Sequence, residues 1–244
     1  MPATSSKAAL AVALLVGATF ASWAQGQPPA GPRVLLVGDS TMAPRSGYGN
    51  ALCAKLLQVA CLNLARGGRS TLSYRAEGLW DTVLTLLRER GPGDTRQRNL
   101  VLIQFGHNDQ PGKPGRSTDL ATEFGPNLAR YVAEVRAEGG EVVLITPLTR
   151  RSFKDGALVN DLRPWAEATL RVGAELGVPV LDLYATSSAA VQALGPEAAD
   201  TLAEAPPRFD RTHLGPKGAA LFAQQVLDGL LALKPELASA QTLR

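Results

Sequence analysis

Short apolar runs that end abruptly at polar or turn-forming residues recur along this chain, and helical patterns separate them. The runs are rich in valine, leucine and isoleucine, which is typical of strands buried on both faces of a sheet. The clearest runs are Val34–Val37, Leu100–Phe105, Val142–Ile145 and Val178–Leu183, and Val59–Leu64 is a further candidate. Alternation of such strands with helices predicts an α/β fold in three layers, a doubly wound parallel sheet with helices on both faces. A last helix is expected to start at Pro216 and to end before Pro235.

The first 32 residues have the pattern of a targeting segment rather than of a folded element. One positive charge precedes an apolar stretch at 8–20, and small residues at Ser22 and Ala24 follow at the spacing of a cleavage site. The apolar stretch is shorter than the roughly 20 residues that a membrane span needs. We therefore expect a signal peptide over 1–24, a linker over 25–32, one domain over 33–234 and a C-terminal tail over 235–244. A secreted or periplasmic location follows, although retention of the segment as an anchor stays open.

The composition excludes several classes of function. The chain has 25 Lys+Arg against 22 Asp+Glu and no basic block, so nothing indicates a nucleic-acid partner. It has only two His and two Cys, without the spacing of a zinc site, and it has no glycine-rich nucleotide loop. We expect no metal and no cofactor. Cys53 and Cys61 would lie roughly 12 Å apart on one helix, too far for a disulfide. A chain that turns back between them would allow the bond, and both readings stay open.

Ligands of parallel α/β sheets bind at the carboxyl ends of the strands, where this chain carries a serine. Ser40 follows the first predicted strand, and its hydroxyl needs a base to act as a nucleophile. His213 is the preferred base because Asp210 stands three residues before it, within reach of the imidazole across a turn. His107 adjoins a strand end and has no separately placed carboxylate in the sequence.

Attack on an ester places negative charge on the carbonyl oxygen, so a site of this kind also needs hydrogen-bond donors. Gly68 lets a backbone N–H approach a ligand closely, and Asn108 offers a neutral amide. The backbone N–H of Ser40 supplies a third donor. These three groups form the predicted oxyanion hole.

Four short motifs resemble the conserved blocks of the SGNH (GDSL-like) hydrolases. They are Gly38-Asp39-Ser40, Gly68, Gly106-His107-Asn108-Asp109 and Asp210-x-x-His213. Within that family, the Gly68-Arg69-Ser70 and Gln104-to-Asp109 segments resemble rhamnogalacturonan acetylesterases. The resemblance implies a flavodoxin-like sheet, no cofactor, Ser40 as nucleophile with Asp210 and His213, and an oxyanion hole of Ser40, Gly68 and Asn108.

The resemblance further implies a serine esterase that removes acetyl groups from plant cell-wall polysaccharide, above all rhamnogalacturonan in pectin, through an acetyl-enzyme. Arg69, Arg45 and Arg151 are then candidates for binding substrate carboxylates, since a guanidinium suits a carboxylate. Two alternatives stay open. One is a broad short-chain acyl esterase or an acetylxylan esterase, and the other is a non-catalytic carbohydrate-binding protein on a hydrolase fold.

Overall fold

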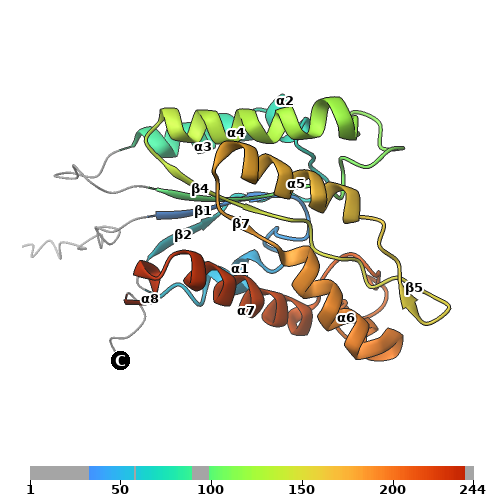
Figure 1. Cartoon of the computed structure of the whole chain (residues 1–244). Coiled ribbons are helices and arrows are strands. Elements are labelled where there is room, and N and C mark those ends of the chain that lie inside the picture. Colours follow the sequence, from blue (N-terminus) through green and yellow to red (C-terminus); the bar gives the residue numbers. More distant parts are fainter. Residues whose placement is uncertain (1–32, 58, 90–98, 240–244) are drawn as a thin grey trace, which may run out of the picture.

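A five-stranded parallel sheet forms the centre of the computed structural model, which describes residues 33–57, 59–89 and 99–239 (Figure 1). The strand order is β2-β1-β3-β4-β7, and every pairing is parallel. This order is that of the flavodoxin-like doubly wound fold, so the predicted fold class is confirmed. The predicted signal peptide at 1–24 and linker at 25–32 lie outside the described residues. The strands are β1 (Arg33–Gly38), β2 (Ala60–Asn63), β3 (Leu100–Gln104), β4 (Glu141–Ile145) and β7 (Val180–Leu181).

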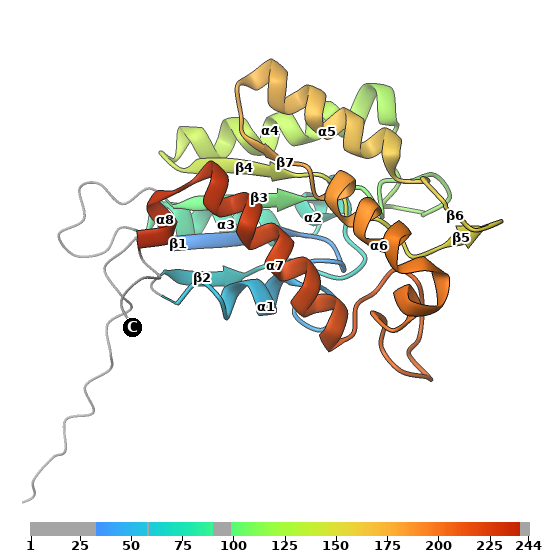
Figure 2. The ribbon, with the colours of Figure 1, turned by 60° about the horizontal axis from the view of Figure 1, so that its bottom comes forward.

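Helices cover both faces of the sheet because successive side chains of each strand point to opposite faces. In β1, Leu35 and Val37 face one helical layer, whereas Val34 and Leu36 face the other. The first layer contains α3 (Leu79–Arg88), α4 (Gly125–Ala137) and α5 (Arg163–Leu176). The second layer contains α1 (Gly49–Cys53), α6 (Leu183–Asp200), α7 (Pro216–Leu233) and α8 (Glu236–Ser239), as Figure 2 shows.

Short elements at the carboxyl ends of the strands complete the described fold. They are α2 (Ser73–Ala76), the π-helix η1 (Leu120–Phe124) and a hairpin of β5 (Phe153–Lys154) and β6 (Ala157–Leu158). The hairpin projects at the end of the sheet to which the strands point (Figure 2). No helix within 33–57, 59–89 and 99–239 is long and apolar enough to cross a membrane.

Two boundaries differ from the sequence prediction by more than one residue. The last strand, expected over 178–183, is only Val180–Leu181, because the Asp182 carboxylate accepts a hydrogen bond from the Ala185 N–H (3.1 Å) and begins α6. The fold also continues past residue 234. Leu237 in α8 is 5% exposed and belongs to the core beneath α7. The start of the predicted tail is therefore part of the folded domain.

Cys53 and Cys61 form a disulfide. The chain turns back between α1 and β2, which brings the two Cα atoms to 5.2 Å. The two cysteines are not on one helix, so the distance that would have prevented the bond does not arise.

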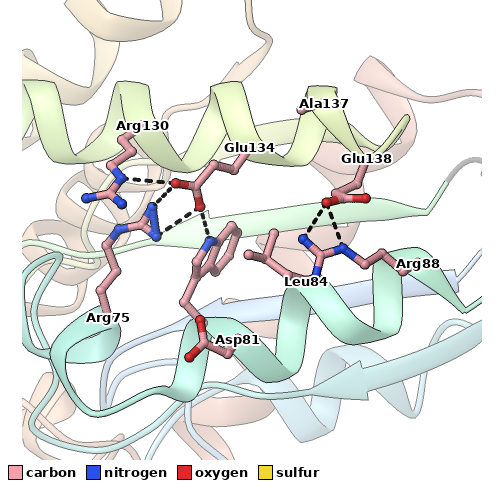
Figure 3. Close-up of a pocket in the computed structure, with 9 residues that line it drawn as sticks. Arg75, Asp81, Leu84, Arg88, Arg130, Glu134, Ala137 and Glu138 are labelled. Atoms are coloured by element: carbon pink, nitrogen blue, oxygen red, sulfur yellow. Dashed lines mark hydrogen bonds and ion pairs between the residues drawn. The ribbon is translucent and has the colours of Figure 1, made fainter.

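A surface groove between α3 and α4 is lined by charged side chains that pair with one another (Figure 3). Arg75 and Arg130 both bind Glu134, and Arg88 binds Glu138. Because these cations already have carboxylate partners inside the groove, it offers little unpaired charge to a ligand. The groove lies on one helical face of the sheet, and Arg75 of α2 lines it as well.

Candidate active site

The loop after β1 carries Ser40 in a tight turn. A Cβ on residue 38 would lie 2.6 Å from the Gln104 carbonyl oxygen, so only glycine fits where β1 meets β3. The Asp39 carboxylate then accepts hydrogen bonds from the backbone N–H (2.9 Å) and the hydroxyl (2.8 Å) of Thr41. These bonds hold Ser40 at the carboxyl edge of the sheet. The Ser40 side chain lies at the surface of the core, with the residue 7% exposed.

His213 and Asp210 form the close pair that their spacing predicts. His213 Nδ1 lies 2.7 Å from Asp210 Oδ2. The other carboxylate oxygen accepts hydrogen bonds from the backbone N–H groups of Thr212 and His213, both at 2.7 Å. Burial raises the pKa of Asp210, but these hydrogen bonds outweigh it and hold the pKa below its ordinary value. Asp210 is therefore an ionised acceptor that orients an imidazole whose side chain is 40% exposed.

One hydrogen bond joins the His213 loop to the Ser40 loop, and a second bond within the Ser40 loop extends the link to Ser40. The backbone N–H of Leu214 donates to the Ser46 carbonyl oxygen (2.9 Å), and the Ser46 hydroxyl donates to the Ser40 carbonyl oxygen (2.7 Å). The predicted nucleophile and the predicted base thus belong to loops that contact each other, although about 170 residues of chain separate them.

Arg151 is a correction to the sequence analysis. We expected its guanidinium to bind substrate carboxylates, but the residue is 0% exposed. It donates to the carbonyl oxygens of Asp210 (2.9 Å) and His213 (2.5 Å). Burial is the main reason that the pKa of Arg151 is lowered. Its side chain therefore braces the loop that carries the Asp210–His213 pair and does not reach a ligand.

The predicted oxyanion donors lie on two further loops. Gly68 has φ +78°, in the left-handed region that favours glycine. A Cβ on the neighbouring Gly67 would lie 3.7 Å from the Ser40 Cβ, so this loop passes directly beside the serine. The Asn108 amide donates one hydrogen to the Arg69 carbonyl oxygen (3.0 Å). An amide nitrogen carries two hydrogens, which leaves the second for a ligand.

Asp109 ties these two loops together, a role that the sequence analysis did not assign. One carboxylate oxygen accepts from the Thr71 N–H (3.0 Å) and hydroxyl (2.5 Å) and from the Thr118 hydroxyl (3.0 Å). The other oxygen is buried and has no hydrogen-bond partner among the described residues. Burial is the main cause that raises the pKa of Asp109 to about 6.

His107 also has a carboxylate partner, which corrects the reason we gave for preferring His213. Its Nδ1 lies 3.2 Å from Asp39 Oδ2. The two residues are 68 positions apart in the sequence, so no local pattern could show the contact. The residue is only 2% exposed, whereas His213 is accessible, and accessibility is now the argument for His213 as the base.

Three cationic side chains, absent from the sequence prediction, contact the loops of the site. The Lys113 ammonium donates to the His107 carbonyl oxygen, and Arg116 Nη1 lies 3.4 Å from the Gly68 carbonyl oxygen. Arg150 donates to the Thr212 hydroxyl (3.2 Å) and pairs with the Asp161 carboxylate. Burial, followed by the charges of Arg150 and Arg116, lowers the pKa of Lys113. Lys113 and Arg116 therefore place positive charge beside these loops, whereas Asp161 neutralises the charge of Arg150.

The other two predicted substrate arginines differ from each other. Arg69 is occupied, because its guanidinium donates to Glu77 (2.8 Å from Nε) and to the Gly67 carbonyl oxygen (2.7 Å). Arg45 is exposed on the loop after Ser40. Substrate contact by either residue stays a prediction. Within the part of the chain that the structure describes, no group of three or more His, Cys, Asp or Glu is placed to hold a metal ion.

Comparison with known proteins identifies the family. Residues 36–221 match the GDSL-like lipase/acylhydrolase family. The chain belongs to this family. It is a carboxylic ester hydrolase, as the sequence predicts. It is 32% identical over 232 residues to the rhamnogalacturonan acetylesterase RhgT of Bacillus subtilis, a match that covers 86% of this chain and 95% of that one.

Solved structures support the fold. The protein YxiM of Bacillus subtilis superposes with a TM-score of 0.70 at 24% identity, over 85% of this chain and 58% of that longer one. A catalytic mutant of Axe2, an acetylxylan esterase from Geobacillus stearothermophilus, superposes with a TM-score of 0.61 at 19% identity, over 83% and 96% of the two chains. At these identities the likeness shows the shared three-layer architecture.

Proposed function

We propose that this GDSL-like hydrolase is a serine acetylesterase that acts on acetylated rhamnogalacturonan. The observation that carries the proposal is the Asp210–His213 pair, 2.7 Å apart, on a loop hydrogen-bonded to the loop of Ser40. This arrangement supplies a nucleophile, a base and a carboxylate that orients the base. The ester bond of an O-acetyl group is within the chemistry that these groups perform.

The reaction has two halves. The Ser40 oxygen attacks the acetyl carbonyl carbon while His213 Nε2 takes the hydroxyl proton. The N–H groups of Ser40 and Gly68 and the second amide hydrogen of Asn108 stabilise the negative carbonyl oxygen. His213 then gives its proton to the departing sugar oxygen, which leaves an acetyl group on Ser40. A water molecule that loses a proton to His213 attacks this ester, and acetate and free Ser40 result.

Two observations favour rhamnogalacturonan over xylan as the substrate. A relative matched over 95% of its length is a rhamnogalacturonan acetylesterase, whereas an acetylxylan esterase shares the fold at 19% identity. Lys113 and Arg116 also place positive charge beside the loops that carry Asn108 and Gly68. Galacturonate residues carry carboxylates that such cations attract, and xylose residues carry none.

The test compares acetate release from three substrates: acetylated rhamnogalacturonan, the same polymer with its carboxyl groups reduced to alcohols, and acetylated xylan. We expect the highest kcat/KM on the native polymer and a loss of about 10-fold, or about 1.4 kcal/mol, on the reduced one. Arg116→Gln should lower the preference for native over reduced polymer, whereas Arg171→Gln on the outer surface of α5 should not. Equal rates on all three substrates would favour the broad esterase, and binding without turnover would favour the carbohydrate-binding protein.

We also propose that the protein is secreted or periplasmic. The N-terminal pattern and the Cys53–Cys61 disulfide support this, because disulfides persist in oxidising compartments. Cleavage after Ala24 predicts that the exported protein begins at Gln25. N-terminal sequencing tests the cleavage, which a product that retains Met1 would contradict, and recovery of the protein from the cytoplasmic fraction would contradict export.

A further inference from the structure

A chain of buried polar side chains runs beneath the candidate site and reaches His107. The Tyr48 hydroxyl donates to Gln104 Oε1, and Gln104 Nε2 donates to the Thr41 hydroxyl oxygen (2.8 Å). That hydroxyl donates to Asp39 Oδ1 (2.8 Å), and Asp39 Oδ2 contacts His107 Nδ1 (3.2 Å). All five residues are at most 2% exposed. Buried polar groups are costly unless satisfied, so each contact in this chain restrains its neighbours.

The directions of these hydrogen bonds fix the role of His107. Burial raises the pKa of Asp39, but the contacts with His107 and Thr41 outweigh it and lower the pKa. An ionised carboxylate only accepts hydrogen bonds, so the ring must present Nδ1–H to Asp39. The opposite ring nitrogen, Nε2, is buried and has no hydrogen-bond partner among the described residues. His107 is thus held through Nδ1, and no described residue forms a hydrogen bond to Nε2 through which it could exchange a proton.

The Asp39–His107 contact directly links the two loops that the reaction requires. Asp39 and Thr41 flank Ser40 on both sides, and Asn108 immediately follows His107. The Lys113 ammonium also donates a hydrogen bond to the His107 carbonyl oxygen. A change in the length of the Asp39–His107 bond would therefore move the Ser40 loop relative to the Asn108 amide.

We propose that His107 is a positioning residue, whose Nδ1–H bond to Asp39 sets the spacing between the Ser40 oxygen and the Asn108 donor. It touches no reacting atom. The inference rests on the proposed function, which assigns the nucleophile and the oxyanion donor. Rates respond steeply to this spacing, since a misplacement of about 1 Å costs about 100-fold and one oxyanion donor is worth about 100- to 1000-fold.

The experiment compares His107→Asn with His107→Leu on an aryl acetate. Asparagine carries an amide nitrogen at the same number of bonds from Cα as Nδ1, so it keeps a donor for Asp39, and leucine removes it. We expect His107→Leu to lower kcat about 10- to 100-fold with KM within about 2-fold, and His107→Asn to recover most of the loss. Thermal unfolding of both variants checks that they fold. If His107→Leu does not fold, His107→Ala takes its place.

Repeating the His107→Leu substitution in the Asn108→Ala variant shows whether His107 acts by placing Asn108 or only supports the fold. If His107 acts by placing Asn108, His107→Leu should cost less than about 3-fold once the amide is absent. An undiminished loss in that background, equal losses in the Asn and Leu variants, or full activity of His107→Leu would each overturn the inference. Ser40→Ala distinguishes a failure of the proposed function from a failure of the positioning role. Activity that survives in that variant overturns the proposed function, whereas an inactive Ser40→Ala with an insensitive His107 overturns only the positioning role.

Discussion

Replacing Arg151 with methionine should both destabilise the protein and slow the reaction. The buried guanidinium makes hydrogen bonds of 2.9 and 2.5 Å to the carbonyl oxygens of Asp210 and His213. Hydrogen bonds from charged groups contribute about 1.5–3 kcal/mol each, and the desolvation cost of the buried cation offsets part of their sum. We therefore expect the free energy of unfolding to fall by about 2–4 kcal/mol. For a domain of this size that corresponds to a decrease in Tm of about 10 °C.

The same variant should lower kcat, because both carbonyls belong to the residues that form the base and its orienting carboxylate. We expect a loss of about 10-fold or more on an aryl acetate at 20 °C, where the variant is still folded. Arg45→Met is the matched control, since it removes an equal charge from an exposed position on the neighbouring loop. Calorimetry and initial rates measure both effects. If Arg151→Met and Arg45→Met had the same Tm and the same kcat, the bracing role of Arg151 would be refuted.

Two further predictions concern stability. Burial raises the pKa of the Asp109 carboxyl from 3.8 to about 6, so the folded state binds a proton at this carboxyl more tightly than the unfolded state does. The protonated carboxyl therefore stabilises the fold at acid pH, and this stabilisation is lost as the pH rises from about 4 through about 6. In the wild type, the free energy of unfolding should therefore fall by about 3 kcal/mol over this pH range, and Asp109→Asn should remove that fall. Urea unfolding of both proteins at pH 4 and pH 7.5 measures it, and an equal change in the two proteins would contradict the prediction. The Cys53–Cys61 disulfide closes a short loop and should contribute about 2.5 kcal/mol. The double alanine variant should have a lower Tm and unchanged kcat, because Cys61 lies beside Val34 in the sheet, six residues before Ser40. An equal Tm would show that the bond contributes nothing.

The sequence predicts those parts of the site whose contacts are local. Asp210 reaches His213 across one turn, and Ser40 directly follows a strand that hydrophobic patterning marks clearly. Contacts between distant segments carry no such signal. Arg151 lies 59 and 62 residues from the carbonyls it binds, so its burial could not be inferred.

The lack of a local signal also explains why the sequence does not show the carboxylate partner of His107. Local spacing gives a carboxylate to His213 alone, but the fold gives one to His107 as well, from 68 residues away. The parallel sheet order brings β1 and β3 side by side and therefore places Asp39 against His107. Sequence reasoning chose His213 because of its nearby aspartate, and the structure adds its greater exposure.

The most direct test of the central claim is to find where the acetyl group goes during turnover. The enzyme is mixed rapidly with an aryl acetate and quenched in acid, and its peptides are analysed by mass spectrometry. We expect an acetyl group on the peptide that contains Ser40, and no acetate release by Ser40→Ala from either the aryl ester or acetylated rhamnogalacturonan. Acetate release by Ser40→Ala at the wild-type rate would contradict the account, as would an acetyl group found on another residue.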